Sequence, residues 1–509
     1  MREGDTIRHR GGRRNRLPSA DPADPVRAGA HGRRAIICAM TSNTPESRPA
    51  APVPTAPDPV QLDTDVLVIG GGPAGTTAAT LLARRGWRVT LLEKDAHPRF
   101  HIGESLLPMN LPILERLGVL DQVHAIGTFK PGAEFPITGE GDPDGGIDDY
   151  NTFRFERALA PKFGHAYQVK REEFDQLLFR HAQANGVDAR EHTRVERIEF
   201  GADGRPAKVH ARNGDGALVV TPRYVVDASG RDALFGSQLR LRRKNAKHQS
   251  AAIFSHFSGV ERRAGEDAGN ITVQRFAHGW MWLIPLREGV MSVGAVCFPE
   301  YLRQRRGDTA ARSNEALLMQ ALQSEPSVWR RMQHAQRIAP VHVTGNYSYT
   351  CSAMHGPGWV MVGDAYAFVD PVFSSGVYLG MNSAERAADV VDGALREPTR
   401  EAALQRAMSD HLTLGLKHFQ WFIYRFTTPV MRHLFNNPSN FWQVDQAVIS
   451  MLAGDVFDNP AVLRRLRLFR FVYAMTALRM APAALQGWWR RRRQVGVAFS
   501  GDTLQQGNP

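Results

Sequence analysis

The 509-residue chain is long enough for two or three domains, and its 43% share of hydrophobic residues is typical of a globular protein with a large core. No apolar run reaches the roughly eighteen residues that a membrane-spanning helix needs, so we expect no transmembrane segment and a cytoplasmic location. The three cysteines, Cys38, Cys297 and Cys351, are scattered, which excludes a metal-ligand spacing or a disulfide framework and fits a reducing compartment. The net charge of +12 comes without a nucleic-acid recognition motif, which makes an acidic protein the favoured partner class.

Shifts in composition predict how the chain is divided. Residues 1–62 are rich in Arg, Pro, Ala, Gly and Ser without an apolar period, which predicts a disordered N-terminal extension. Residues 63–400 contain the motifs described below and are expected to form an α/β core. Residues 401–494 show a helical, aromatic-rich pattern, and residues 495–509 are expected to be a disordered tail.

A strand–helix–strand unit between Asp65 and Glu93 is the stretch around which this core is organised. Residues 66–69 and 89–92 are predicted to be short buried strands, and residues 74–85 the helix between them. The first turn matches G-x-G-x-x-G, whose missing side chains let the backbone approach a pyrophosphate at the helix N-terminus. The Glu93 carboxylate, at the end of the second strand, can accept hydrogen bonds from ribose hydroxyls. The predicted dinucleotide contacts here are Gly70, Gly72, Pro73, Ala74, Gly75 and Glu93.

The next two segments place polar groups in apolar surroundings. Residues 101–108 contain Ser105, which belongs either to a simple capping turn or to a small backbone loop beside a flavin ring. The alternation around Lys130 predicts a strand and its turn. A lysine between Phe129 and Pro131 normally extends its ammonium group to solvent, so this segment alone does not favour a catalytic role.

Later segments add candidate contacts to the cofactor. A helix is predicted to begin at Tyr167, and Gln168 and Arg171 either lie against the cofactor or form an ordinary charged helix N-terminus. A buried strand beginning at Trp359 ends at Asp364, an acid that can hold the ribityl hydroxyls of a flavin.

Two tryptophans follow one another at strand spacing. Trp280 and Trp282 are two positions apart, so on a strand their indoles share one face. They form either a rigid wall, followed by Ile284 and Pro285, or a normally packed sheet face.

A small-residue turn precedes a long helix predicted from about residue 377 to residue 395. Ser374, Ser375 and Gly376 make a predicted N-cap and backbone nest, which favours a small anion. A plain capping turn is the alternative.

Several of these blocks together resemble a known family. The glycine-rich turn, Gly363-Asp364 and the chain length resemble the p-hydroxybenzoate hydroxylase-like flavoproteins. This implies a Rossmann-type FAD-binding domain, an interleaved mixed β-sheet on the substrate side and a helical C-terminal region. Within that class, Trp280-x-Trp282-x-Ile284-Pro285 resembles the W-x-W-x-I-P motif of flavin-dependent halogenases. Residues 101–108 and 368–376 resemble two further blocks of that family, and Lys130 falls in the segment of its catalytic lysine.

The resemblance implies a reaction in which FADH2 and O2 oxidise chloride or bromide to hypohalous acid. Trp280 and Trp282 would keep the organic acceptor away from the flavin. Lys130 would hold the oxidised halogen, by a hydrogen bond or as a haloamine, and direct it at an electron-rich ring. The implied halide site consists of Ser374, Ser375 and Gly376, with Gly376 also against FAD.

One departure from the family pattern bears on the acceptor. Phe373 stands where halogenases of free tryptophan resemble one another in having a glutamate. The chain therefore looks closer to the branch that acts on phenols, pyrroles or carrier-bound aryl groups in secondary-metabolite or pigment biosynthesis. The basic C-terminal helices, with Arg490–Arg493, suit an acidic acyl or peptidyl carrier protein. No second dinucleotide motif is evident, so we expect a separate flavin reductase to supply FADH2.

Two other functions are compatible with the same scaffold. A FAD-dependent monooxygenase or a prenyl-chain reductase would share the fold, which by itself separates neither from a halogenase. A flavin-loaded scaffold protein without turnover would leave Lys130, Trp280 and Trp282 without a purpose. These three residues favour the halogenase.

Overall fold

Two large sheets organise the chain, whose computed structural model describes residues 59–137, 149–245, 248–306, 313–345 and 348–495. The first sheet comprises β1 (Val60–Ile69), β2 (Val89–Leu92), β7 (Asp188–Arg190), β8 (Arg194–Phe200), β9 (Pro206–Asn213), β10 (Gly216–Asp227), β19 (His355–Gly356) and β20 (Trp359–Met361). Its order is β19-β20-β10-β1-β2-β7, and β8 and β9 extend it as an antiparallel meander next to β10. The central strands β20, β10, β1, β2 and β7 are parallel, as the predicted dinucleotide unit requires.

Strand β1 corrects the predicted N-terminal boundary. Residues 66–69 are buried between β2 and β10, in agreement with the predicted buried strand. The strand nevertheless begins at Val60, and its exposed first residues pair with Leu218 and the residues after it. Assigning residues 60–62 to a disordered extension was therefore wrong, because backbone pairing continues where the apolar pattern has stopped. Residues 1–58 and 496–509 lie outside the described residues.

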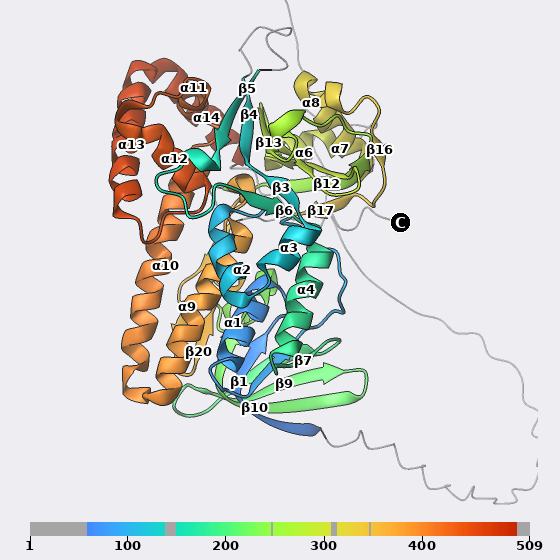
Figure 1. Cartoon of the computed structure of the whole chain (residues 1–509), viewed down its shortest axis with the longest axis vertical. Coiled ribbons are helices and arrows are strands. Elements are labelled where there is room, and N and C mark those ends of the chain that lie inside the picture. Colours follow the sequence, from blue (N-terminus) through green and yellow to red (C-terminus); the bar gives the residue numbers. More distant parts are fainter. Residues whose placement is uncertain (1–58, 138–148, 246–247, 307–312, 346–347, 496–509) are drawn as a thin grey trace, which may run out of the picture. The chain divides into compact units, whose positions relative to one another are not determined.

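Four long helices accompany the first sheet. They are α1 (Pro73–Ala83), α4 (Arg171–Ala184), α9 (Gly376–Arg396) and α10 (Glu401–Ile423). Helix α1 packs against α4 and α9, and α9 packs in turn against α10, as Figure 1 shows. Both helices predicted to begin at glycine-containing turns, α1 and α9, therefore lie side by side.

The second sheet is largely antiparallel. Its strands are β4 (Gly132–Pro136), β5 (Tyr150–Arg154), β12 (Ala251–Ser258), β13 (Ile271–Phe276), β14 (Gly279–Pro285), β15 (Met291–Cys297), β16 (Gln336–Arg337) and β17 (His342–Thr344). Their order is β16-β12-β15-β14-β13-β4-β5, with β17 also paired to β12. Trp280, Trp282 and Ile284 belong to the core cluster shared with α1 and α9, which confirms that the two indoles occupy one face. Met281 and Leu283 pack on the opposite face, in a core with α6 (Pro299–Arg306), α7 (Asn314–Gln323) and α8 (Pro326–Arg331).

Short elements connect the two sheets. They are α2 (Leu111–Leu117), α3 (Leu120–Ile126), β3 (Thr128–Lys130), β6 (Ala166–Gln168), α5 (Leu234–Gln238), β11 (Arg242–Lys244), β18 (Tyr349–Cys351) and β21 (Ala367–Phe368). Strand β6 pairs with β3, so the helix predicted to begin at Tyr167 begins only at Arg171. Cross-strand pairing of Phe129 with Tyr167 overrides the helical pattern there.

The C-terminal region consists of helices, as predicted. After α10 come α11 (Pro429–Asn436), α12 (Val444–Leu452), α13 (Pro460–Arg479) and α14 (Ala481–Val495), drawn in red in Figure 1. None of the helices in the described ranges is long and apolar enough to cross a membrane.

Candidate active site

A cavity of about 840 Å³ lies where the carboxyl ends of β1 and β2 face the tryptophan-bearing side of β14. Its position at the carboxyl edge of parallel strands is where α/β sheets bind ligands. Twelve of the predicted site residues line it: Gly70, Gly72, Pro73, Ala74, Glu93, Ser105, Arg171, Trp280, Trp282, Asp364, Ser374 and Gly376. Four do not: Gly75, Lys130, Gln168 and Ser375.

The turn before α1 is shaped for an anion. Gly70 has a φ of +105°, and a Cβ there would lie 2.4 Å from the Ala228 carbonyl oxygen. A Cβ on Gly75 would lie 1.9 Å from the carbonyl oxygen of Gly70, so Gly75 serves close packing rather than direct contact. The α1 N-cap residue, Gly72, provides no side-chain cap, and the first turn holds no acid. The N–H groups at this helix start are therefore available to a pyrophosphate.

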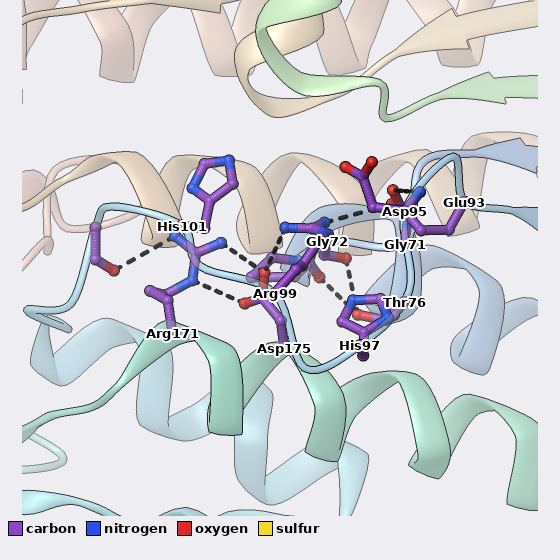
Figure 2. A network of polar contacts seen from close by, with 12 residues as sticks. Gly71, Gly72, Thr76, Glu93, Asp95, His97, Arg99, His101, Arg171 and Asp175 are labelled. Carbon is purple, nitrogen blue, oxygen red and sulfur yellow. Dashed lines mark hydrogen bonds and ion pairs between the residues drawn. The ribbon is translucent and has the colours of Figure 1, made fainter. Parts of the chain in front are cut away.

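Glu93 joins this turn to a polar network that Figure 2 shows. Its Oε2 accepts hydrogen bonds from Gly71 N at 2.7 Å and from Arg99 Nη2 at 3.3 Å. Its Oε1 accepts from Asp95 N at 3.0 Å. Arg99 also reaches Asp175, with 3.5 Å between Nη1 and Oδ2. The carboxylate is thus held at the strand end, at the edge of the cavity, as a ribose contact would require.

Arg171 continues this network through Asp175 and also lines the cavity. Its guanidinium donates two hydrogen bonds to Asp175, at 2.7 and 2.9 Å, and one to the Ile102 carbonyl at 2.7 Å. Burial tends to raise the pKa of Asp175, but the charge and hydrogen bonds of Arg171 hold that pKa below its ordinary value. His101 also lines the cavity, and desolvation there, helped by the nearby Arg171 charge, lowers the pKa of its imidazole.

Sequence reasoning missed Arg99 and Asp175, the two residues that connect Glu93 to Arg171. Asp175 lies four positions after Arg171 on α4, which is the spacing of an ion pair on a helix. This spacing could have indicated the Arg171–Asp175 pair from the sequence. Arg99 comes from the loop after β2, and no local pattern indicates its direction.

Lys130 is buried rather than extended to solvent. Only 1% of its surface is exposed. Its Nζ donates hydrogen bonds to Ser105 Oγ and to the Leu106 carbonyl, both at 2.8 Å, and lies 5.3 Å from the centre of the Phe155 ring. Burial lowers the pKa of the Lys130 ammonium to about 7, which gives a substantial neutral fraction at physiological pH.

Lys130 lines a second, smaller pocket beside the large cavity. The lining residues of that pocket are Leu107, Lys130, Ala133, Phe135, Phe155, Ile271, Val273, Val372, Phe373, Ser374 and Leu452. Ile271 and Ser374 line both spaces, whereas Trp280 and Trp282 line only the large cavity. At about 10 Å³, the Lys130 pocket admits no aromatic ring without movement of its lining side chains.

Both indoles are fixed by polar contacts. Trp280 Nε1 donates to Asp370 Oδ1 at 3.0 Å, and Trp282 Nε1 donates to Ser292 Oγ at 3.1 Å. The two rings lie 5.7 Å apart at 45°. Sequence reasoning missed Asp370, although it falls inside the block 368–376. Burial raises the pKa of its carboxyl to about 6.

The entry to α9 differs from the predicted cap. Ser375 stands at the N-cap, but its side chain makes no capping hydrogen bond, and its buried Oγ has no hydrogen-bond partner among the described residues. The predicted N-cap position is therefore confirmed, but the serine side chain does not cap the helix. Ser374 adopts a left-handed conformation with a φ of 57°, and a Cβ on Gly376 would meet no atom within 4 Å. Backbone N–H groups, rather than hydroxyls, are what this turn can offer an anion.

Of the two remaining predicted site residues, one lines the cavity and the other does not. Asp364 lines the cavity, and burial raises the pKa of its carboxyl to about 6. Gln168 does not reach the cavity: its amide nitrogen donates to the Gly269 carbonyl at 3.1 Å. Gln168 lies in a strand that pairs with β3, not in the predicted helix, and it is absent from the cavity lining.

Comparisons with known proteins agree with this geometry. The model of a family described as FAD binding domain matches residues 63–417. The chain is 36% identical to the flavin-dependent halogenase armH3 of Armillaria mellea, over 66% of this chain and 69% of that protein. It is 38% identical to a tryptophan 2-halogenase of Chondromyces crocatus, over 64% of this chain but only 60% of that protein. The solved structure of the myxobacterial chondrochloren halogenase superposes with a TM-score of 0.65 at 30% identity, covering 88% of this chain and 96% of that one.

The chain belongs to the flavin-dependent halogenases. FAD is its cofactor class, and the halogenase fold predicted from the sequence is confirmed. The residues present fit FAD on structural grounds as well: this halogenase has a glycine cradle, an uncapped α1 N-terminus and a buried acid at the β2 end, all on one elongated cavity.

Proposed function

We propose that this halogenase uses FADH2 and O2 to oxidise chloride or bromide and then halogenates an electron-rich aromatic ring, a phenol or a pyrrole, in secondary-metabolite or pigment biosynthesis. The observation that carries this proposal is the burial of Lys130 in a separate pocket that adjoins the cofactor cavity. The relatives named as halogenases support the reaction class.

FAD would be held by the turn before α1, by Glu93 and by Arg171, with Asp364 near its ribityl chain. Bound as FADH2, it supplies, with O2, the oxidising power that converts a halide into an electrophilic halogen species. The backbone at Ser374, Ser375 and Gly376 would hold the halide at the edge of this cavity.

Lys130 would carry the halogen from the cofactor to the acceptor. Its amine is fixed by Ser105 and Leu106, so little orientation is lost when it holds a hypohalous acid. The apolar lining of the pocket strengthens any charged contact made there and limits loss of the oxidant to water. Ser374 lines both spaces, so the halogen would pass beside it.

The acceptor class follows from what the Lys130 pocket lacks. None of its described lining residues is a carboxylate. The nearby Glu134 is engaged elsewhere, because its Oε1 accepts a hydrogen bond from Thr272 Oγ1 at 2.5 Å. Without a general base beside the ring, the acceptor must already be electron-rich, as phenols and pyrroles are. Phe373 in this lining is the residue that the sequence indicated.

Two further acceptor forms have specific support. The Chondromyces crocatus relative is named for tryptophan, which makes an indole the second candidate. A chlorinase of Pseudomonas fluorescens, named for a pyrrole-carbonyl group on a peptidyl-carrier protein, is 30% identical over 65% of this chain and 76% of that protein. It supports a carrier-bound acceptor. FADH2 would come from a separate reductase.

A hydroxylase is disfavoured by the position of the indoles. Hydroxylation requires the acceptor to reach the flavin directly, and Trp280 and Trp282 form part of the cavity wall there. A prenyl-chain reductase would give no purpose to a buried lysine hydrogen-bonded in a separate pocket.

The test is product analysis by mass spectrometry. The purified protein is supplied with reduced FAD, O2 and either chloride or bromide, together with phenols, pyrroles and tryptophan, free and carrier-bound. We expect a halogen-containing phenol or pyrrole. A hydroxylated product without halogen, or no product that depends on halide, would overturn the proposal.

A further inference from the structure

Helices α13 and α14 have an extreme charge composition. Residues 460–495 contain nine arginines and neither aspartate nor glutamate. Six of these arginines are exposed: Arg464, Arg467, Arg479, Arg490, Arg492 and Arg493. Within the described ranges, none of the six forms an ion pair with a carboxylate. The surface around them is therefore strongly positive.

The same two helices also expose large apolar side chains. Fourteen large hydrophobic residues are exposed in the described part of the chain, and six of them lie on α13 and α14. Their exposed fractions run from 42% to 69%, and the residues are Phe471, Met475, Leu478, Leu485, Trp488 and Trp489. Such a cluster marks an interaction surface. We name these six residues and the six exposed arginines the α13–α14 face.

The two kinds of side chain follow a helical order. On α13, Arg464 and Arg467 precede Phe471, Met475 and Leu478 at spacings of three or four, so all five lie along one side of the helix. On α14 the order is reversed, and Leu485 and the two tryptophans precede the arginines. Most of the apolar groups thus lie nearer to the turn between the helices than most of the arginines do, although Arg479 ends α13 at that turn.

The exposed side of α13 is opposite to the side that packs into the core of the protein. Val462, Leu466 and Phe469 are buried and pack into the main core. On α14, Gly487 packs against Pro429 of α11. Figure 1 shows both helices within the C-terminal helical region, apart from the first sheet. The outward apolar residues are therefore not required to hold the helices in place.

We propose that the α13–α14 face binds the surface of an anionic phospholipid bilayer. Arginines beside exposed tryptophan, phenylalanine and leucine are the composition of helices that lie in a membrane interface. The arginines would bind lipid phosphates, and the apolar groups would enter the boundary between headgroups and acyl chains. This inference goes beyond halogenation and does not depend on it.

Two other occupants fit less well. A second copy of the chain would place this acid-free surface against an identical one, and like charges would oppose each other. Binding of the acidic carrier protein expected from the sequence would explain the positive charge of Arg490–Arg493. Charge attraction alone, however, gives no role to the six exposed apolar side chains.

The experiment is co-sedimentation of the full chain with vesicles of phosphatidylcholine, with and without phosphatidylglycerol. We expect at least about tenfold stronger binding to the anionic vesicles, weakened by high salt, with a blue shift of tryptophan emission. Replacing Leu485, Trp488 and Trp489 with serine, or Arg490, Arg492 and Arg493 with glutamate, should each reduce binding by about tenfold or more. Matched controls elsewhere on the surface are Ile338→Ser and the pair Lys208→Glu and Arg406→Glu, which should bind like the unaltered chain.

Three outcomes would overturn the inference. One is equal sedimentation with neutral and anionic vesicles. Another is loss of binding on arginine reversal but not on serine replacement, because that result indicates a purely charge-driven contact such as carrier docking. The third is absence of vesicle binding together with a dimer, seen by analytical ultracentrifugation, that the serine variant abolishes. Thermal unfolding of each variant checks that it is folded.

Discussion

At the scale of single residues, the burial of Lys130 lowers the stability of the fold and also lowers the pKa of the amine. Burying an ammonium group is unfavourable, and among the described residues two hydrogen bonds and an aromatic face compensate it. No acid lines its pocket in the described residues. We therefore propose that Lys130 is a reactive amine, because its lowered pKa of about 7 makes part of it neutral and nucleophilic near pH 7.

Because burial of the Lys130 ammonium is unfavourable, an apolar side chain at this position should stabilise the fold. Lys130→Met should raise the free energy of unfolding by about 1–3 kcal/mol near pH 6. The folded chain holds the Lys130 pKa near 7, below its unfolded value of 10.5, so the penalty is complete below pH 7 and fades as the pH rises toward 10. The advantage of the variant should fade with it. Denaturant unfolding at several pH values measures this.

Lys162→Met is the matched control. Lys162 also lies over a phenylalanine ring, 5.5 Å from the centre of Phe163, but 58% of its side chain is exposed. Its replacement should change stability by less than about 0.5 kcal/mol. A Lys130→Met variant that is less stable than the unaltered protein at every pH would contradict the account of Lys130.

At the scale of elements, two helix starts and two strand ends build the cofactor site. The N-termini of α1 and α9 both face the cavity, and both begin with glycine-containing turns without a side-chain cap. The carboxyl ends of β1 and β2 provide its floor. The opposite wall is the strand β14, whose period of two places both indoles on the cavity side.

The proposed place of the α9 N-terminus in the cofactor site can be tested by adding a side chain at Gly376. Because a Cβ on Gly376 meets no atom of the chain, Gly376→Val should fold normally while its side chain occupies space needed by FAD or halide. We expect FAD affinity to fall by about tenfold or more, a loss of about 1.4 kcal/mol. Flavin fluorescence titration measures it. Gly214→Val, in an exposed turn with equally open space, should bind FAD normally. Equal affinity of both variants would remove α9 from the cofactor site.

The predictions from the sequence were most accurate for features that depend on one short stretch of the chain. The β1–α1–β2 unit and the shared face of Trp280 and Trp282 follow from periods of two and 3.6 within one stretch. The sequence-based prediction failed where contacts join distant segments. Pairing with β3 places Gln168 in a strand and not in the predicted helix, and Arg99 and Asp175 meet from different parts of the chain. The burial of Lys130 depends on Ser105 and Phe155, about 25 positions away on either side, and no local pattern encodes such packing.

At the scale of the whole molecule, the two adjoining spaces are lined by different sets of strands. The first sheet and α1 shape the cofactor cavity, and β3, β4 and β13 of the connecting and second sheets shape the Lys130 pocket. One glycine-rich strand–helix turn of the dinucleotide type was found in the sequence, and this is the basis for expecting that reduced flavin comes from a separate reductase.

This arrangement predicts dependence on a second protein. The purified chain with FAD should not oxidise NADH or NADPH at an appreciable rate, and halide-dependent turnover should begin only when a flavin reductase is added. The nicotinamide absorbance and the halogenated product are followed together. Rapid oxidation of either nicotinamide by the chain alone would show that a second cofactor site exists.

The relay of oxidised halogen by Lys130 is tested most directly by comparing Lys130→Met with Lys162→Met under reduced FAD, O2 and halide. Free hypohalous acid and the ring-halogenated product are measured in the same reaction. We predict that Lys130→Met binds FAD and still releases hypohalous acid but halogenates the acceptor at least about 100-fold more slowly, a barrier increase of about 2.7 kcal/mol. Lys162→Met should behave like the unaltered protein. Normal ring halogenation by Lys130→Met would contradict the account.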